Sequence, residues 1–249
     1  MTTRLTLSAL TAILGLGLAG DALAKQPPKG PVKTIKVESC PMDDSQFWSH
    51  WAAVRGYEHM INGDFNEAAA CYQKASQMYG IGADWKIAGK RSLVCDAYNR
   101  ISEILSNLPK NALNLRERET FEESAQKALK SGNKPLAAKL FELTALGWYV
   151  GPEGSTGRFE YEPLHREGGS WQDSYLRGGH FMGVAAGLVT DNTEKKRLLG
   201  LEKDITAVML DTGHCSSSDY QVKQHGEQPY EDCKQAQETV ARLETILKK

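Results

Sequence analysis

The feature that most constrains the fold is a helix–turn–helix pattern centred on Gly63. This glycine can adopt the positive φ that ends a helix, and Asp64 follows it. A stripe of small, large and small side chains then comes at helical spacing, formed by Ala68, Tyr72 and Ala75. The pattern predicts two antiparallel helices that pack closely against each other.

The same pattern recurs further along the chain. Gly132 lies 69 residues after Gly63, and the residues that repeat the stripe in the same register are Ala137, Ala138 and Phe141. A third, degenerate copy is predicted between the two. Trp85 and Gly89 begin this copy, Asp96 stands in place of the turn glycine, and its second-helix stripe consists of Tyr98, Ile101, Leu105 and Leu108. Without a turn glycine, this middle copy can run as one longer helix.

These units resemble the tetratricopeptide repeat, a helix–turn–helix unit of 34 residues. Gly56 occupies the small site at which the first helix of that repeat crosses the second. The resemblance covers roughly residues 48–148 and implies an all-α array of about three hairpins. The alternative is a generic antiparallel helix pair that carries small residues by chance.

In this repeat family, the first helices of successive units line a concave groove that receives a peptide or a helix of a partner protein. Carried over by position, the resemblance implies a lining of ten residues: His50, Ala53, Tyr57, Met60, Lys86, Lys90, Leu93, Glu122, Gln126 and Leu129. An aromatic ring, a methionine and charged groups suit a protein surface with an apolar centre and a polar margin. Alternatively, these are ordinary solvated positions of an array that binds along its edge.

Residues 1–24 have the pattern of a signal peptide. Arg4 precedes an apolar run from about Leu5 to Leu18, and Ala22-Leu23-Ala24 fits the A-x-A cleavage pattern. The mature chain is therefore expected to begin near Lys25 and to be periplasmic or secreted; an uncleaved membrane anchor is the alternative. The Pro- and Lys-rich residues 25–44 are predicted to form an extended linker before the array at 45–150.

The five cysteines lack the spacing of a zinc site, and export makes disulfides the default. Cys215 and Cys233 are the favoured pair, because their bond closes a loop rich in Ser, Gly and Gln. If two antiparallel helices are joined by a turn near residues 80–82, the position opposite Cys71 is about 91. Cys95 is then about one helical turn too far along for a bond, and Cys40 can pair with either cysteine.

Residues 151–249 are expected to form a Gly-rich loop at 151–170 and three further helices, near 171–189, 192–210 and 230–247. Glycines spaced by four residues on the first of these helices (Gly179, Gly183 and Gly187) permit close helix contact. These helices either cap the array or form an independent small domain.

Composition and motifs suggest a binding protein rather than an enzyme. The chain carries 30 basic and 31 acidic residues, which gives no electrostatic reason to expect nucleic acid or a membrane as partner. No cofactor is expected, because the sequence contains no P-loop, dinucleotide fingerprint or H-E-x-x-H motif. The favoured hypothesis is an exported, non-enzymatic scaffold or assembly factor of the cell envelope that binds another protein or peptide. The rival is an envelope hydrolase with its site in residues 151–249, where His180 faces Glu202, Asp204 or His165. A purely structural secreted factor is a third possibility.

Overall fold

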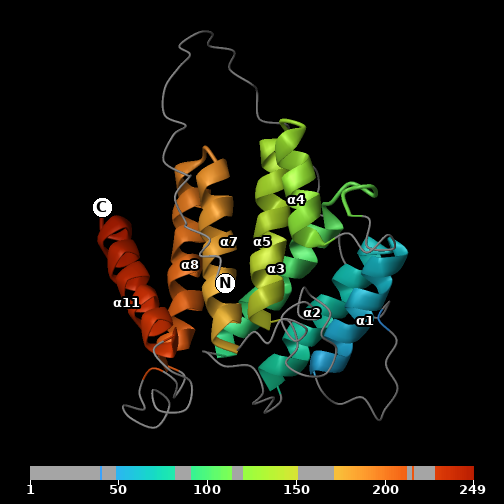
Figure 1. Ribbon diagram of the computed structural model, residues 1–249. Coiled ribbons are helices and arrows are strands. Elements are labelled where there is room, and N and C mark those ends of the chain that lie inside the picture. Colours follow the sequence, from blue (N-terminus) through green and yellow to red (C-terminus); the bar gives the residue numbers. More distant parts are fainter. Residues whose placement is uncertain are drawn as a thin grey trace, which may run out of the picture. The chain divides into compact units, whose positions relative to one another are not determined.

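The computed structural model describes residues 40, 49–81, 91–113, 120–150, 171–211, 215 and 228–249 (Figure 1). These residues contain helices and no strands, so the all-α prediction is confirmed for this part of the chain. The helices are α1 (Ser49–Asn62), α2 (Phe65–Ile81), α3 (Arg91–Ser106), α4 (Phe121–Lys130), α5 (Lys134–Val150), α7 (Trp171–Leu188), α8 (Asn192–Asp211) and α11 (Gln228–Leu247). The predicted signal peptide and, apart from Cys40, the predicted linker lie outside the described residues.

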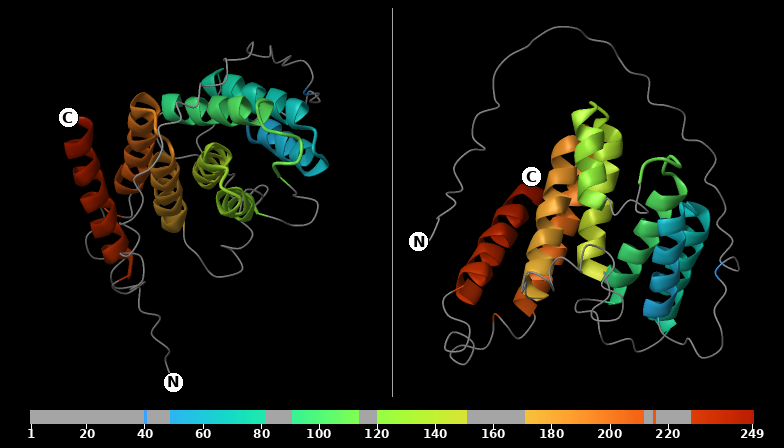
Figure 2. Two further views of the ribbon diagram at one scale, coloured as in Figure 1. Left: turned by 90° about the horizontal axis from the view of Figure 1, so that it is seen from above. Right: turned by 45° about the vertical axis from the view of Figure 1, so that its right-hand side comes forward.

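The helices pack largely in the order of the sequence, within one compact unit (Thr34–Lys249). Helix α1 packs on α2, α2 on α3, and both α3 and α4 on α5. Helix α5 then packs on α7, α7 on α8, and α8 on α11 (Figure 2). Among the described helices, none combines the length and the apolar character that crossing a membrane requires.

Two of the connections, α1–α2 and α4–α5, have the same turn. Gly63 and Gly132 both have φ +80°, the left-handed conformation expected of a glycine that ends a helix. In the first turn, Gly63 N donates to Met60 O and Asp64 N donates to His59 O, each at 2.9 Å. In the second turn, Gly132 N donates to Leu129 O and Asn133 N donates to Ala128 O, so each donor is as far from its acceptor along the chain as in the first turn. Both helices therefore end in a Schellman motif, and the next helix starts two residues later.

Small residues let the two helices of the first hairpin approach closely. A Cβ atom added at Gly56 of α1 would lie 2.7 Å from the ring of Tyr72 on α2, a distance that real Cβ contacts do not reach. Tyr72 is fully buried, as are Ala68 and Ala75 of the predicted stripe. In the second hairpin, Ala137 and Phe141 are buried at the corresponding positions.

The middle copy is one helix where the structure describes it. Helix α3 passes through Asp96 without a turn, and it buries the predicted stripe residues Tyr98, Ile101 and Leu105. Its register against α2 differs from the expected one: Ser76 Oγ donates to Cys95 O at 3.0 Å, and Ser102 Oγ donates to Ala69 O at 2.7 Å. The prediction that the position opposite Cys71 lies near 91 is therefore wrong. Because α2 continues to Ile81 and α3 begins only at Arg91, the opposite position lies near 100.

One hydrophobic core runs from α1 to α8 without interruption at residue 150. Phe141 of α5 and Phe181 of α7 stack with their ring centroids 6.1 Å apart, and Tyr149 and Tyr175 make a second aromatic contact between the same helices. On α7, a Cβ atom at Gly178 would lie 3.1 Å from the backbone oxygen of Ala145. Helices α7 and α8 thus extend the core of the hairpins.

Two of the predicted glycines on α7 adjoin α8. A Cβ atom at Gly179 would overlap the hydroxyl of Thr206, and one at Gly183 would lie 2.8 Å from Glu202 Oε2. Nothing lies within 4 Å of a Cβ atom at Gly187, so the close contact is made by the first two glycines. Helix α8 begins where Asp191 Oδ1 accepts a hydrogen bond from Glu194 N at 2.8 Å, as expected of a capping residue.

Candidate partner-binding surface

The residues predicted on α1 divide into buried and half-buried positions. Ala53 and Met60 are each only 1% exposed, and both belong to the hydrophobic core. Their assignment to an open groove lining is wrong, because they fill the contact between α1 and α2. Tyr57 is half-buried and packs against the core from the same helix, so part of its ring remains at the surface. The side chain of His50 lies outside the described residues.

The residues predicted on α4 remain at the surface. Gln126 is exposed, and Glu122 and Leu129 are half-buried. A capping box fixes the start of this helix: Glu123 N donates to Thr120 Oγ1 at 3.0 Å, and Thr120 N donates to Glu123 Oε2 at 2.8 Å. Because the Schellman motif fixes its other end, α4 presents these three side chains from a helix defined at both termini.

The middle copy contributes less than the resemblance implies. Lys86 and Lys90 lie outside the described residues. Leu93 is half-buried on α3, the same helix that carries the buried stripe of Tyr98 and Ile101. Leu93 therefore does not lie on a separate first helix, which is where the resemblance places it.

The contacts between elements separate α1 and α4 from the remaining helices of the array. Helices α2, α3 and α5 pack in succession, whereas α1 packs on α2 and α4 packs on α5. Tyr72 of α2 and Tyr98 of α3 join this row, with stacked rings whose centroids are 6.3 Å apart. Helix α1, which packs on α2, carries Tyr57, and helix α4, which packs on α5, carries Gln126 and Leu129.

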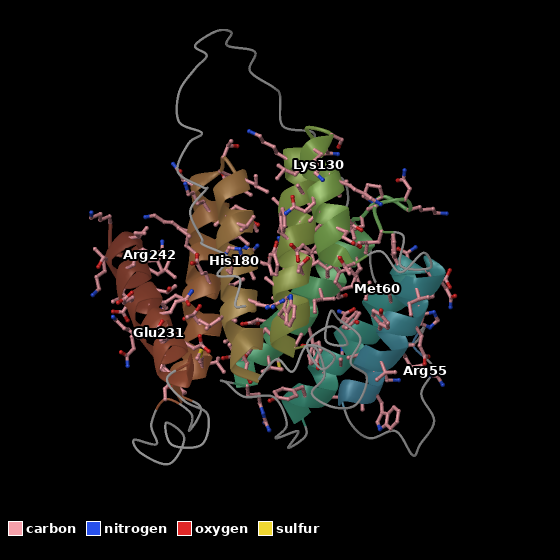
Figure 3. The ribbon with its side chains drawn as sticks, viewed as in Figure 1. Arg55, Met60, Lys130, His180, Glu231 and Arg242 are labelled. Carbon is pink, nitrogen blue, oxygen red and sulfur yellow. A yellow bond between two sulfur atoms is a disulfide. The ribbon has the colours of Figure 1, made fainter. Side chains whose placement is uncertain are left out.

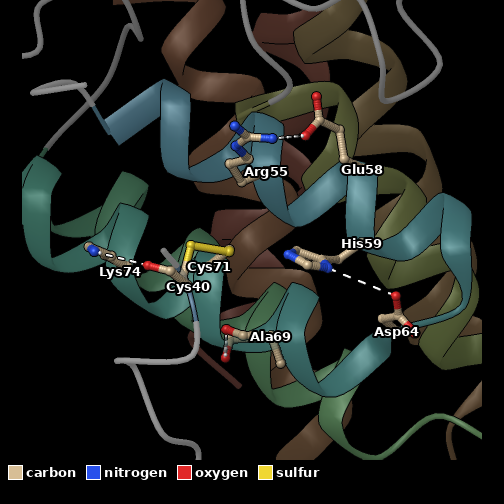
Figure 4. The surroundings of a disulfide bond; sticks show 9 residues. Cys40, Arg55, Glu58, His59, Asp64, Ala69, Cys71 and Lys74 are labelled. Carbon is tan, nitrogen blue, oxygen red and sulfur yellow. Dashed lines mark hydrogen bonds and ion pairs between the residues drawn. A yellow bond between two sulfur atoms is a disulfide. The ribbon is translucent and has the colours of Figure 1, made fainter. Parts of the chain in front are cut away.

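A disulfide attaches the segment before α1 to α2. Cys40 bonds to Cys71 with a Cα–Cα distance of 4.9 Å, and Lys74 Nζ donates to Cys40 O at 3.1 Å (Figure 4). Of the two pairings left open by the sequence, the structure contains this one, and Cys95 is free. The bonded position on α2 is therefore covered by Cys40.

The second disulfide is the expected one. Cys215 and Cys233 are bonded with a Cα–Cα distance of 5.6 Å. Cys233 packs with Met209 of α8 and Ala236 of α11 in a small cluster of its own. Two disulfides indicate that the chain folds in an oxidising, extracytoplasmic environment.

A network of charged groups, which the sequence did not predict, links α3, α5 and α8. Glu142 of α5 is only 2% exposed, and Arg100 of α3 binds both of its oxygens, at 2.8 and 2.9 Å. Arg197 of α8 donates to the same carboxylate at 2.6 Å. Glu194 accepts from both arginines, at 3.2 Å from Arg100 and 2.7 Å from Arg197. Arg100, Glu142 and the Glu194–Arg197 pair come from three helices far apart in the sequence and match no motif, so the sequence did not indicate that they meet.

The network shifts the pKa values of Glu194, Arg100 and Arg197. Hydrogen bonds from Arg197 lower the pKa of Glu194 below its ordinary value, although partial burial opposes this shift. The pKa of Arg100 is raised, because the hydrogen bonds and charge of Glu142 outweigh the cost of burying the guanidinium. The buried charges are thus compensated, and this site is suited to holding helices in register rather than to proton transfer.

The structure does not bring together the residues of the rival hydrolase hypothesis. His180 is exposed, and the edge of its ring contacts the neighbouring Phe181. Glu202 lies against Gly183 and accepts from Arg242 of α11 at 3.0 Å, and Asp204 pairs with Lys203. Burial raises the pKa of Glu202, partly offset by Arg242. His165 lies outside the described residues. Among the residues that the structure describes, no group of three His, Cys, Asp or Glu side chains could hold a metal ion.

Comparisons with protein-family models, curated proteins and solved structures found no match to this chain. The resemblance to tetratricopeptide repeats therefore rests on the residues of this sequence.

Proposed function

We propose that this chain is an exported, non-enzymatic scaffold or assembly factor of the cell envelope, which holds a partner polypeptide against α1 and α4. The observation that supports it best is the repeated hairpin. Two helix pairs, with turn glycines 69 residues apart, share the same glycine turn and the same buried stripe, and their second helices both contact α3. Such repetition is typical of proteins that bind other proteins over an extended surface.

The side chains left at the surface of the first helices support this reading. Tyr57 and Leu129 offer apolar area beside the core, and Gln126 and Glu122 supply polar groups next to Leu129. Tyrosine is common among the residues that dominate binding energy at protein interfaces. The partner is thus a polypeptide segment with apolar side chains and polar flanks.

The two disulfides support a location outside the cytoplasm. Together with the predicted signal peptide at 1–24, they favour a periplasmic or secreted protein, the former if the source is a Gram-negative bacterium. A partner is accordingly sought among components of envelope machines, such as secretion, pilus or outer-membrane complexes.

Copurification from envelope extracts tests this proposal. The variants Tyr57→Ala and Gln126→Ala alter the proposed surface on α1 and α4, Lys90→Glu alters a lining residue that the resemblance implies, and Glu238→Ala alters the exposed side of α11 as a matched control. We expect a partner to copurify with the unmodified chain and with the control, and to be lost or reduced by the surface variants. Circular dichroism of each purified variant shows whether loss of the partner reflects loss of folding. Retention of every partner by all three surface variants would contradict the assignment.

A further inference from the structure

A concentration of lysines occurs where α4 meets α5 and where α8 begins. Segments 129–139 and 188–196 contain five exposed lysines: Lys130, Lys134, Lys139, Lys195 and Lys196. The same segments contain two carboxylates, Asp191 and Glu194. Asp191 caps α8, and Glu194 is already bound to Arg100 and Arg197. The whole chain has a net charge of −1, so these two segments carry more positive charge than the chain as a whole.

The buried charge network brings the two segments together. Arg197, next to Lys196 on α8, binds Glu142, which lies one helical turn beyond Lys139 on α5. Lys139 is also near enough to Glu194 for its charge to lower the pKa of that carboxyl group. The stretches of α5 and α8 that carry Lys139 and Lys196 are therefore within reach of the same charged side chains. Lys130, at the end of α4, is separated from Lys134 only by the Gly132 turn (Figure 3).

The side chains around these lysines favour a polypeptide over other anionic partners. Four half-buried aliphatic residues belong to the same two segments: Leu129, Leu136, Leu188 and Val189. Neither segment contains an aromatic residue on which a nucleic-acid base could stack, and neither contains an arginine for paired phosphate contacts. The arginines nearby, Arg100 and Arg197, are engaged with carboxylates. Lysines that alternate with aliphatic side chains complement a peptide of acidic and apolar residues.

We propose that this basic surface, defined by Lys130, Lys134, Lys139, Lys195 and Lys196, binds an acidic segment of the partner polypeptide. The proposal rests on the proposed function, because it takes a polypeptide as the partner. Leu129 and Lys130 are adjacent on α4, so the basic surface continues the proposed partner-binding surface toward α8. The lysines attract and orient the acidic segment, and the neighbouring aliphatic side chains add apolar contact.

The test measures binding of a defined peptide to the purified mature chain. The probe is a fluorescein-labelled peptide that repeats Glu-Glu-Leu, and its neutral counterpart repeats Gln-Gln-Leu. The quadruple variant Lys130→Glu, Lys134→Glu, Lys195→Glu, Lys196→Glu reverses the surface charge and leaves Lys139, the neighbour of Glu194, unchanged. Its matched control, Lys110→Glu, Lys234→Glu, Lys248→Glu, Lys249→Glu, makes the same change of charge at exposed positions outside the two segments.

At low ionic strength, the unmodified chain is expected to bind the acidic peptide and not the neutral one. The quadruple variant should weaken this binding about tenfold or more, whereas the control should change it by less than about threefold. Equal binding by the unmodified chain and the quadruple variant would overturn the proposal. Polyphosphate, or vesicles containing phosphatidylglycerol, that bind through the same lysines more tightly than the acidic peptide would also overturn it.

This test and that of the proposed function fail separately. Peptide binding is measured with the purified chain and with lysine variants, whereas copurification is measured with variants of Tyr57, Gln126 and Lys90. If the unmodified chain does not bind the acidic peptide, the proposal that the partner segment is acidic is wrong, and the proposed function is unaffected.

Discussion

Gly56 lies directly against the aromatic ring of Tyr72, and this contact determines how closely the first two helices approach. The spacing of small and large residues predicted it, because Gly56 and Tyr72 occupy defined positions of a repeat. Glu142 illustrates the opposite case. Its partners, Arg100 and Arg197, come from two other helices, and only the packing of α3, α5 and α8 brings them within hydrogen-bond distance.

Gly56→Ala should destabilise the fold by about 1–3 kcal/mol, because the added methyl group requires the Tyr72 ring or the backbone to move. Gly200→Ala is the matched control, since nothing lies within 4 Å of its added Cβ atom. In the interior of α8, that substitution should be neutral or stabilise by about 0.5–1 kcal/mol. Urea unfolding of both variants measures the difference; equal stabilities would contradict the close contact.

Glu142→Gln should lower the free energy of unfolding by about 3 kcal/mol, because it leaves two arginines without their buried counter-charge. The control is Glu58→Gln, which removes an exposed pair with Arg55 and should cost less than about 1 kcal/mol. Chemical denaturation of the two variants makes the comparison. A loss no larger at Glu142 than at Glu58 would show that the network does not hold the helices.

The elements differ in how far the sequence predicts them. Hydrophobic periodicity and capping residues placed the last three helices to within a few residues of α7, α8 and α11. The register of α3 against α2 was missed, because the predicted turn near residues 80–82 made the connection too short: α2 continues to Ile81, and α3 begins only at Arg91. The pairing of Cys40 with Cys71 likewise joins positions 31 residues apart, and helical periodicity does not define such a contact.

Gly63→Ala and Gly132→Ala should each destabilise the protein by about 1–2 kcal/mol, because alanine at φ +80° places its Cβ atom against the backbone. Contact with other parts of the protein is not the cause, since nothing beyond the glycine itself and its two chain neighbours lies within 4 Å of either added Cβ atom. Asparagine tolerates this conformation better, so Gly63→Asn and Gly132→Asn should cost less. Thermal unfolding of all four variants tests whether the two turns are equivalent. If alanine and asparagine cost the same, backbone conformation is not the cause.

The connection of α8 to α3 and α5 should weaken in acid. The folded pKa of Glu194 is lowered, so its stabilising contribution is complete above about pH 4.3, its unfolded value, and is lost as the pH falls through the folded value. Glu194→Gln should therefore reduce the acid dependence of the free energy of unfolding. Glu202 has a raised folded pKa, so it favours the folded state more in acid than near neutrality, and Glu202→Gln should steepen the acid loss. Changes of the same sign in the two variants would contradict these assignments.

For the molecule as a whole, periodicity predicted the all-helical class, but it did not predict that the hairpins share one hydrophobic core with α7 and α8. The sequence left open a cap or an independent domain. The aromatic contacts between α5 and α7, and the backbone approach at Gly178, show that α7 and α8 share the core of the hairpins. A composition shift after Val150 marks a connection, and it does not reveal whether the cores on either side are continuous.

Both disulfides should contribute to global stability. Replacing Cys215 and Cys233 with serine should lower the free energy of unfolding by about 3 kcal/mol. Replacing Cys40 and Cys71 should lower it by about 4 kcal/mol, because the Cys40–Cys71 bond closes the longer loop. Peptide mapping without reduction should recover these two linkages, with Cys95 as a free thiol. A linkage through Cys95 would refute the pairing.

The most direct measurement of the central claim is photo-crosslinking in living cells. A benzophenone amino acid is placed at Tyr57 on α1 or Gln126 on α4, and at Glu238 on α11 for comparison. The account predicts that one partner protein crosslinks from both Tyr57 and Gln126 and not from Glu238. Crosslinking from Glu238 alone, or no crosslinked protein from either first helix, would contradict it.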